Sequence, residues 1–128
     1  MKKDLPYCDI VLPVFNGLTY VKDCITSILE NSKASPYRLY VIDDCSDHVT
    51  SNYLTKLAED HPQISLHRNS ENLGFVKSCN IGIGHGQSPY VVIINSDVIV
   101  TPGWLSRLLR CAESDPYIAL VNPFTNVI

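Results

Sequence analysis

The chain has 128 residues, of which 45% are hydrophobic and 18% are charged, and it carries a net charge of −3. This length and composition favour one compact globular domain, residues 1–128, and exclude an intrinsically disordered chain. Because the ten basic residues are scattered and outnumbered by acidic ones, we do not expect nucleic acid as a partner. No apolar run is long enough to cross a bilayer, so we expect no membrane span in this chain.

Apolar runs alternate with helical patterns along the chain. Residues 9–15 predict a buried strand, and apolar residues three and four positions apart then predict a helix: Leu18, Val21, Ile25, Ile28 and Leu29. Residues 37–42 predict a second short strand. Asp47 is a candidate N-cap for the next helix, and the inward positions of that helix are expected to be Val49, Tyr53 and Leu57.

The second half of the chain continues this alternation. Residues 64–68 alternate apolar and polar side chains, which indicates a strand near a sheet edge. A shorter helix is predicted over residues 74–83. Residues 90–95 form the most uniformly apolar run, so we expect a central strand that is buried on both faces.

The last predicted elements are a helix and a short strand. Thr101 and Pro102 are typical of an N-cap and a first helical turn, and the expected inward positions are Leu105, Leu108, Leu109 and Ala112. Residues 118–121 predict the start of a fifth strand. Because strand and helix alternate four times, we expect an α/β fold with a doubly wound, mainly parallel sheet and helices on both faces.

The cysteine pattern indicates the cellular compartment. The five cysteines are an odd number, are widely spaced and include no C-x-x-C pair. This pattern is typical of reduced thiols rather than of a disulfide framework or a structural zinc site. The first residues carry charge without the apolar stretch of a signal peptide. We therefore expect a cytoplasmic protein.

Polar side chains gather where three of the predicted strands end. They fall at residues 13–16, 43–44 and 95–97, and the ligands of such sheets bind at the carboxyl ends of the strands. The chain has neither a G-x-G-x-x-G nor a P-loop motif, so a phosphorylated ligand would need a metal ion to compensate its charge. Asp97 is the candidate anchor for Mg²⁺ or Mn²⁺, which take oxygen ligands.

Four segments that include these polar ends resemble the successive sequence blocks of family 2 glycosyltransferases. They cover residues 9–16, 41–47, 69–82 and 92–105, so the likeness extends over nearly the whole chain. The resemblance implies a GT-A fold, of which this chain would form the Rossmann-like half that binds a nucleotide sugar. It also implies metal-assisted transfer of a sugar from a nucleoside diphosphate donor, with UDP or dTDP favoured, to an acceptor hydroxyl, with inversion at the anomeric carbon.

The resemblance also implies roles for individual residues. Phe15 stands where an aromatic ring stacks on the base, and Asp44 stands where a carboxylate accepts a hydrogen bond from it. Asp97 stands at the metal position, although Asn95 replaces the first carboxylate of the D-x-D motif. The implied nucleotide-binding residues are Pro13, Val14, Phe15, Asn16, Asp43, Asp44, Lys77, Asn80 and Ser96.

Each candidate residue also has a structural explanation. Phe15 could belong to the core, and the aspartates at 43–44 could form an Asx turn or cap a helix. Asp97 could shape the turn after a buried strand. Lys77 could be a solvated helix residue, and Asn80 a buried amide that bonds to a neighbouring loop.

The sequence favours an enzyme whose catalytic base lies elsewhere. After Asp115 the chain has no Asp, Glu or His, whereas the family's base lies well downstream of its D-x-D motif. We therefore expect a donor-binding domain that is truncated before the catalytic-base segment, with that base beyond Ile128, and that is inactive alone. A sheet without its later strands would also expose an apolar edge, which favours a homodimer.

Three other classes of protein share parts of this pattern. A non-catalytic nucleotide-binding or regulatory module of the same fold stays open as an alternative. A sugar-phosphate nucleotidyltransferase would need a basic, Gly-rich loop after the first strand, and residues 16–19 lack it. A receiver-type domain would carry its acidic pair after the first strand rather than after the second.

Overall fold

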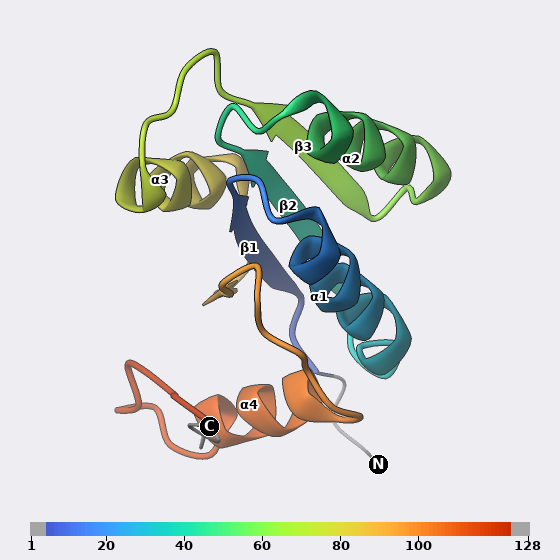
Figure 1. Ribbon diagram of the computed structural model, residues 1–128. Helices are drawn as coiled ribbons and strands as arrows, with labels where there is room; N and C mark the ends of the chain where they lie inside the picture. Colours follow the sequence, from blue (N-terminus) through green and yellow to red (C-terminus); the bar gives the residue numbers. More distant parts are fainter. Residues whose placement is uncertain (1–4, 124–128) are drawn as a thin grey trace.

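The computed structural model describes residues 5–123 and shows strands and helices that alternate along the chain (Figure 1). Its elements are β1 (Cys8–Val14), α1 (Leu18–Asn31), β2 (Tyr37–Asp43), α2 (His48–Asp60), β3 (Ile64–Arg68), α3 (Phe75–His85), β4 (Tyr90–Ile93) and α4 (Trp104–Glu113). The strands form one parallel sheet in the order β3-β2-β1-β4. The predicted α/β class and parallel sheet are therefore confirmed. Within residues 5–123, no helix has the length and apolar character needed to span a membrane.

Helices cover both faces of the sheet, as expected. One face of β1 presents Ile10, Leu12 and Val14 to the main core, which also contains buried side chains of α1, α2 and α4. On the opposite face, Val11 lies so close to Gly82 of α3 that a methyl group at that glycine would overlap its side chain. Figure 1 shows α3 on one side of the sheet and α1 and α2 on the other.

The register of the sheet brings several strand ends to one edge. Val14 of β1 is paired with Asp43 of β2, which is paired in turn with Arg68 of β3. This alignment continues past the strands, because Asp44 N–H donates to the Val14 carbonyl and Asn69 N–H donates to the Asp43 carbonyl, each at 2.8 Å. The loops that leave this edge are therefore neighbours in space.

The prediction of a central strand over residues 90–95, buried on both faces, is wrong. Strand β4 covers Tyr90–Ile93, pairs with β1 and lies at an edge of the described sheet. Val91 and Ile93 are 42% and 48% exposed, because α3 packs mainly on β1 and β2 and leaves this face of β4 uncovered. An apolar run alone does not show how many faces of a strand are covered.

Helix α2 begins as predicted, and two of its three expected inward residues, Tyr53 and Leu57, are partly buried against the core. Asp47 caps it, since its carboxylate accepts from Thr50 N–H at 2.9 Å. Val49, an expected inward residue, is 65% exposed, and the buried residues are Thr50 and Leu54. The cap at residue 47 fixes where the helix starts, whereas the packing surface decides which face turns inward.

Two predictions near the end of the chain also differ from the structure. Thr101 does not cap α4, because its carbonyl accepts from Trp104 N–H in a turn and Gly103 precedes the helix. Residues 118–121 form no strand within the described part of the chain. The inward positions of α4 were better predicted, since Leu105 and Leu109 are buried.

Candidate functional site

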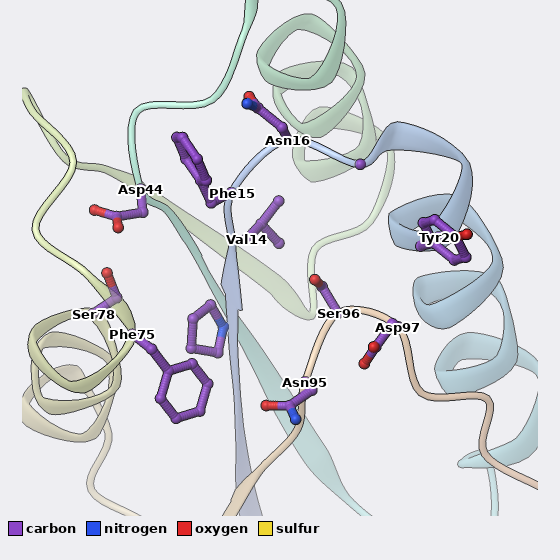
Figure 2. A pocket seen from close by; sticks show the side chains of 12 residues that line it. Val14, Phe15, Asn16, Tyr20, Asp44, Phe75, Ser78, Asn95, Ser96 and Asp97 are labelled. Atoms are coloured by element: carbon purple, nitrogen blue, oxygen red, sulfur yellow. The ribbon is translucent and has the colours of Figure 1, made fainter. Parts of the chain in front are cut away.

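A pocket of about 370 Å³ opens where β1 and β2 end and where the chain leaves β4 (Figure 2). Its lining consists of Pro13, Val14, Phe15, Asn16, Gly17, Tyr20, Asp44, Phe75, Ser78, Asn95, Ser96 and Asp97. Figure 2 shows Phe15 and Asp44 on one side of the pocket, and Asp97 and Tyr20 on the other. The polar ends of three strands thus converge on one cavity.

The loop after β1 holds an exposed aromatic ring at the pocket. Phe15 is 53% exposed, although it follows a strand that is buried throughout, so it does not belong to the core. Asn16 and Gly17 have left-handed backbone conformations, with φ of 55° and 71°, which turn the chain into α1. Asn16 is tied to the next loop, because its N–H donates to Ser46 Oγ at 2.9 Å and its Oδ1 accepts from Asp47 N–H at 2.8 Å.

Asp44 presents a buried carboxylate at the pocket. Its Oδ1 accepts from Asn69 Nδ2 at 2.9 Å and from Leu73 N–H at 2.8 Å, and its Oδ2 accepts from Gly74 N–H at 2.9 Å. Burial opposes the charged form, but these hydrogen bonds, together with Ser78, outweigh it and lower the pKa of Asp44 below its ordinary value. The side chain is therefore an anion at neutral pH.

Asp43 has different surroundings and does not line the pocket. Its carboxylate forms an ion pair with Arg68 and accepts from Ser46 N–H at 2.9 Å. Arg68 also donates to the Ser46 carbonyl at 3.0 Å, and the Ser46 hydroxyl accepts from Asn16 N–H. Through Ser46, Asp43 supports the loop that carries Phe15.

A turn over residues 95–98 forms the opposite wall. Val98 N–H donates to the Asn95 carbonyl at 3.2 Å and closes the turn, and Ile94 N–H donates to a β1 carbonyl at 3.0 Å and ties its start to the sheet. The Asp97 side chain is exposed and Ser96 is half-buried. Among residues 5–123, no group of three or more His, Cys, Asp or Glu side chains could hold a metal ion. A cation here would therefore need oxygens from a ligand or from water.

Most of the predicted site residues meet at this pocket. Those in its lining are Pro13, Val14, Phe15, Asn16, Asp44, Ser96 and Asp97, and those outside it are Asp43, Lys77 and Asn80. Lys77 and Asn80 are exposed on α3, so Asn80 is not a buried amide.

Five lining residues were not among the predicted site residues: Gly17 and Asn95, which adjoin predicted ones, and Tyr20, Phe75 and Ser78. Tyr20 lies in the first turn of α1, while Phe75 and Ser78 are three positions apart at the start of α3 and so share one face of that helix. The small residues Ser78, Cys79 and Gly82 are the buried ones of α3. This stripe of small residues is the sequence signal that could have identified Ser78, because it indicates that Ser78 rather than Lys77 faces the sheet edge.

Comparison with known proteins gives a consistent result. The sequence model of the family described as "Glycosyl transferase family 2" matches residues 9–126. An uncharacterized glycosyltransferase of Haemophilus influenzae is 25% identical over 126 residues, which cover 98% of this chain and 39% of that protein. Glycosyltransferase GlyG of Streptococcus pneumoniae is 24% identical over 114 residues, which cover 88% of this chain and 38% of that protein. The chain thus spans less than half the length of these relatives.

A solved structure shares the fold. The mannosyltransferase PcManGT from Pyrobaculum calidifontis, in complex with GDP-Man and Mn²⁺, superimposes with a TM-score of 0.78 at 21% sequence identity. The match covers 91% of this chain and 34% of that one. This likeness confirms the expected Rossmann-like, GT-A-type arrangement.

Proposed function

Because the chain belongs to glycosyl transferase family 2, we propose that its pocket binds a nucleoside diphosphate sugar, whose sugar the protein transfers to an acceptor hydroxyl. One observation carries this proposal: Phe15, Asp44 and Asp97, far apart in sequence, line the same cavity of about 370 Å³. A base needs a stacking surface and a polar partner, and a diphosphate needs compensation of its charge. The pocket offers a group for each need.

Phe15 and Asp44 form the proposed base subsite. The exposed ring of Phe15 offers the stacking surface. The Asp44 carboxylate lines the pocket as an anion, and a carboxylate can only accept hydrogen bonds. The imide N–H of uracil or thymine is a donor that such a carboxylate can bind. We therefore propose a UDP or dTDP donor.

Asp97 is the proposed anchor for Mg²⁺ or Mn²⁺. It supplies one exposed carboxylate, and Asn95 and Ser96 supply amide and hydroxyl oxygens from the same turn. This donor set fits a cation that takes one or two protein carboxylates and completes its shell with substrate phosphates and waters. When bound, such a cation stabilises negative charge on the leaving diphosphate.

We propose that this chain supplies the donor side of an inverting reaction. The pocket lining includes two carboxylates, of which Asp44 is held by three hydrogen bonds and Asp97 is assigned to the cation. Neither is therefore suited to remove the acceptor's proton. We expect the general base to come from residues outside this chain, and we expect the chain alone to transfer no sugar.

Calorimetric titration with UDP, in the presence and absence of Mn²⁺, tests this function. We expect Mn²⁺ to strengthen binding about tenfold. Phe15→Ala should weaken binding about tenfold with or without Mn²⁺, because stacking on an aromatic ring is worth about 1–3 kcal/mol per base. Asp97→Asn should remove the Mn²⁺ effect and leave metal-free binding unchanged.

Two matched variants control for general effects of substitution. Tyr117 is 94% exposed on the chain after α4, and Asp60 is exposed at the end of α2. Tyr117→Ala and Asp60→Asn should bind UDP like the unsubstituted protein. A folded protein that binds none of UDP, dTDP and GDP would contradict the proposed function.

A non-catalytic nucleotide-binding or regulatory module is the alternative. The pocket favours it in one respect, because neither carboxylate in the described lining is suited to act as a general base. Both functions predict the same titration. They differ in the intact protein, where a transferase consumes a UDP- or dTDP-sugar in the presence of an acceptor and a binding module leaves it unchanged.

Two further proposals concern the surroundings of the protein. The exposed side chains Val91 and Ile93 line an apolar groove of about 460 Å³ together with residues of α4 and of the chain after it, and we propose that a second copy of the chain covers this edge. A protein that elutes as a monomer at every concentration in size-exclusion chromatography would refute this.

All five cysteines are free thiols, which supports the proposal of a cytoplasmic location.

A further inference from the structure

Helix α1 carries polar side chains on the face that meets the segment after β4. Cys24 and Ser27 are buried and Asn31 is half-buried, and their spacing of three and four positions places them on one side of the helix. The facing segment, residues 95–100, has no regular secondary structure. Its backbone groups therefore cannot rely on a neighbouring strand for hydrogen bonds.

Each of these three side chains contacts a backbone group of the segment. Cys24 Sγ donates to the Asn95 carbonyl at 3.6 Å. Ser27 Oγ accepts from Val100 N–H at 3.1 Å, and Asn31 Nδ2 donates to the Val100 carbonyl at 3.0 Å. The Ser27 hydroxyl is itself oriented, because it donates to the Cys24 carbonyl at 2.7 Å. Both ends of the segment are thus bound to one helix.

These contacts act on the turn that carries the proposed metal anchor. The Asn95 carbonyl, which accepts from Cys24, also accepts from Val98 N–H and so closes the turn around Asp97. The cysteine is therefore more than the small apolar filler that its burial alone would indicate.

We propose that Cys24, Ser27 and Asn31 are positioning residues that hold the 95–97 turn with Asp97 at the pocket. They thereby set how strongly a divalent cation promotes nucleotide binding, an inference that rests on the proposed function. A binding group must be held within about 0.5 Å of its working position, and Asp97 has no second carboxylate in its turn to compensate a displacement.

The base subsite should not depend on these three residues. Asp44 is held by the loop between β3 and α3, and the loop of Phe15 is held by Ser46 after β2. Loss of the α1 contacts should therefore weaken the effect of Mn²⁺ and spare the metal-free binding of UDP. A general loss of structure would weaken both together.

Calorimetric titration of the intact protein with UDP separates these two outcomes. The measured quantity is the ratio of the Kd without Mn²⁺ to the Kd with Mn²⁺. In Ser27→Ala and in Asn31→Leu we expect this ratio to fall by about fivefold or more, a coupling typical of linked sites, while the metal-free Kd stays within about twofold. Ser35→Ala should keep the ratio, because Ser35 is a buried serine whose hydroxyl has no partner within the described residues.

A conservative pair at residue 24 gives a further check. Cys24→Ser keeps a donor for the Asn95 carbonyl and should retain more of the Mn²⁺ effect than Cys24→Ala, which removes it. If Ser27→Ala does not fold, the ratio measured for Asn31→Leu tests the inference, because Asn31 is only half-buried. An unchanged ratio in a folded variant, or equal losses of affinity with and without Mn²⁺, overturns this inference but leaves the proposed function standing. If the unsubstituted protein binds none of UDP, dTDP and GDP, the proposed function and this inference with it are overturned.

Discussion

Asp43 and Asp44 are consecutive residues, yet their carboxylates have separate partners and face different parts of the molecule. Asp43 is paired with Arg68 and with Ser46 N–H, whereas Asp44 lines the pocket and is held by donors that include Gly74 N–H. Successive side chains at a strand end point to opposite faces, so the Asp43 carboxylate supports a loop while the Asp44 carboxylate lines the cavity. Two adjacent negative charges are tolerated because each has its own donors.

The Asp43–Arg68 pair should contribute measurably to stability. We expect Asp43→Asn to lower the free energy of unfolding by about 2 kcal/mol. This is less than the roughly 3–5 kcal/mol lost when a fully buried pair is broken, because the Arg68 side chain is 41% exposed. Urea denaturation measures the change, and Asp60→Asn, at the exposed end of α2, is the control for loss of a negative charge.

A double-mutant cycle shows whether the two groups act on each other. Asp43→Asn combined with Arg68→Met should cost less than the sum of the single changes, with a coupling of about 1 kcal/mol or more. Strictly additive losses would mean that the pair does not hold the Ser46 loop, and that Asp43 acts through its bond to Ser46 N–H alone.

Asp44 should make stability depend on pH in the acidic range. Its pKa is lowered in the folded protein, since its hydrogen bonds outweigh the effect of burial, whereas an unfolded aspartate titrates near about 4. Below that pH the unfolded chain takes up a proton before the folded one does. This part of the stability is therefore complete above about pH 5 and is lost as the pH falls through the lowered pKa.

The variant Asp44→Asn isolates this contribution. Its amide has one acceptor oxygen in place of two, so it cannot accept from Leu73 N–H and Gly74 N–H as Oδ1 and Oδ2 do, and the variant should be less stable at pH 7. Its urea midpoint should also fall less steeply than that of the unsubstituted protein between pH 5 and pH 3, in roughly the window where aspartates titrate. Asp60→Asn should keep the original slope. Parallel curves for Asp44→Asn and the unsubstituted protein would show that Asp44 is not stabilised as an anion.

The sequence predicted the strand ends better than it predicted which side chains act there. Apolar runs that stop at polar residues located Phe15, Asp44 and Asp97 correctly at one sheet edge, because parallel strands bring their carboxyl ends together. The pairing of Asp43 with Arg68 could not be predicted, since it depends on the register between β2 and β3. Neither residue type nor spacing encodes that register.

The sequence also did not specify which face of α3 is exposed or that β4 lies at an edge of the sheet, and these two features share one cause. Lys77 and Asn80, which the family resemblance indicated, are exposed on α3 and lie outside the pocket lining, and the packing of Gly82 against β1 decides which face of α3 is hidden. The same helix does not cover β4, so this apolar strand lies at the sheet edge with one face exposed. Both outcomes depend on where α3 lies on the sheet, which local patterns do not specify.

Two glycines of α3 should respond to alanine in opposite directions. A methyl group at Gly82 would overlap the Val11 side chain of β1, whereas one at Gly84 would meet nothing within 4 Å. We expect Gly82→Ala to lower the free energy of unfolding by about 1–3 kcal/mol through overpacking. Gly84→Ala should raise it by up to about 1 kcal/mol, because alanine favours the helix. Equal effects in urea denaturation would show that α3 does not pack closely on β1 at Gly82.

The cysteines should react in an order set by their burial. Cys111 is exposed and Cys45 is partly exposed, whereas the other three thiols are buried. Burial raises the pKa of Cys8 to about 12 and that of Cys24 to about 11, so almost no thiolate is available at pH 8, and the thiolate is the form that attacks alkylating reagents.

Iodoacetamide labelling followed by peptide mass analysis can follow this order. At pH 8 we expect Cys111 to be labelled first and Cys45 more slowly, while Cys24 is labelled in denaturant and not in the folded protein. Cys111→Ser should remove the fastest phase without changing the others. Rapid labelling of Cys24 in the folded protein would mean that its thiol does not rest under the turn at Asn95, and the proposed link between α1 and Asp97 would lose one of its three contacts.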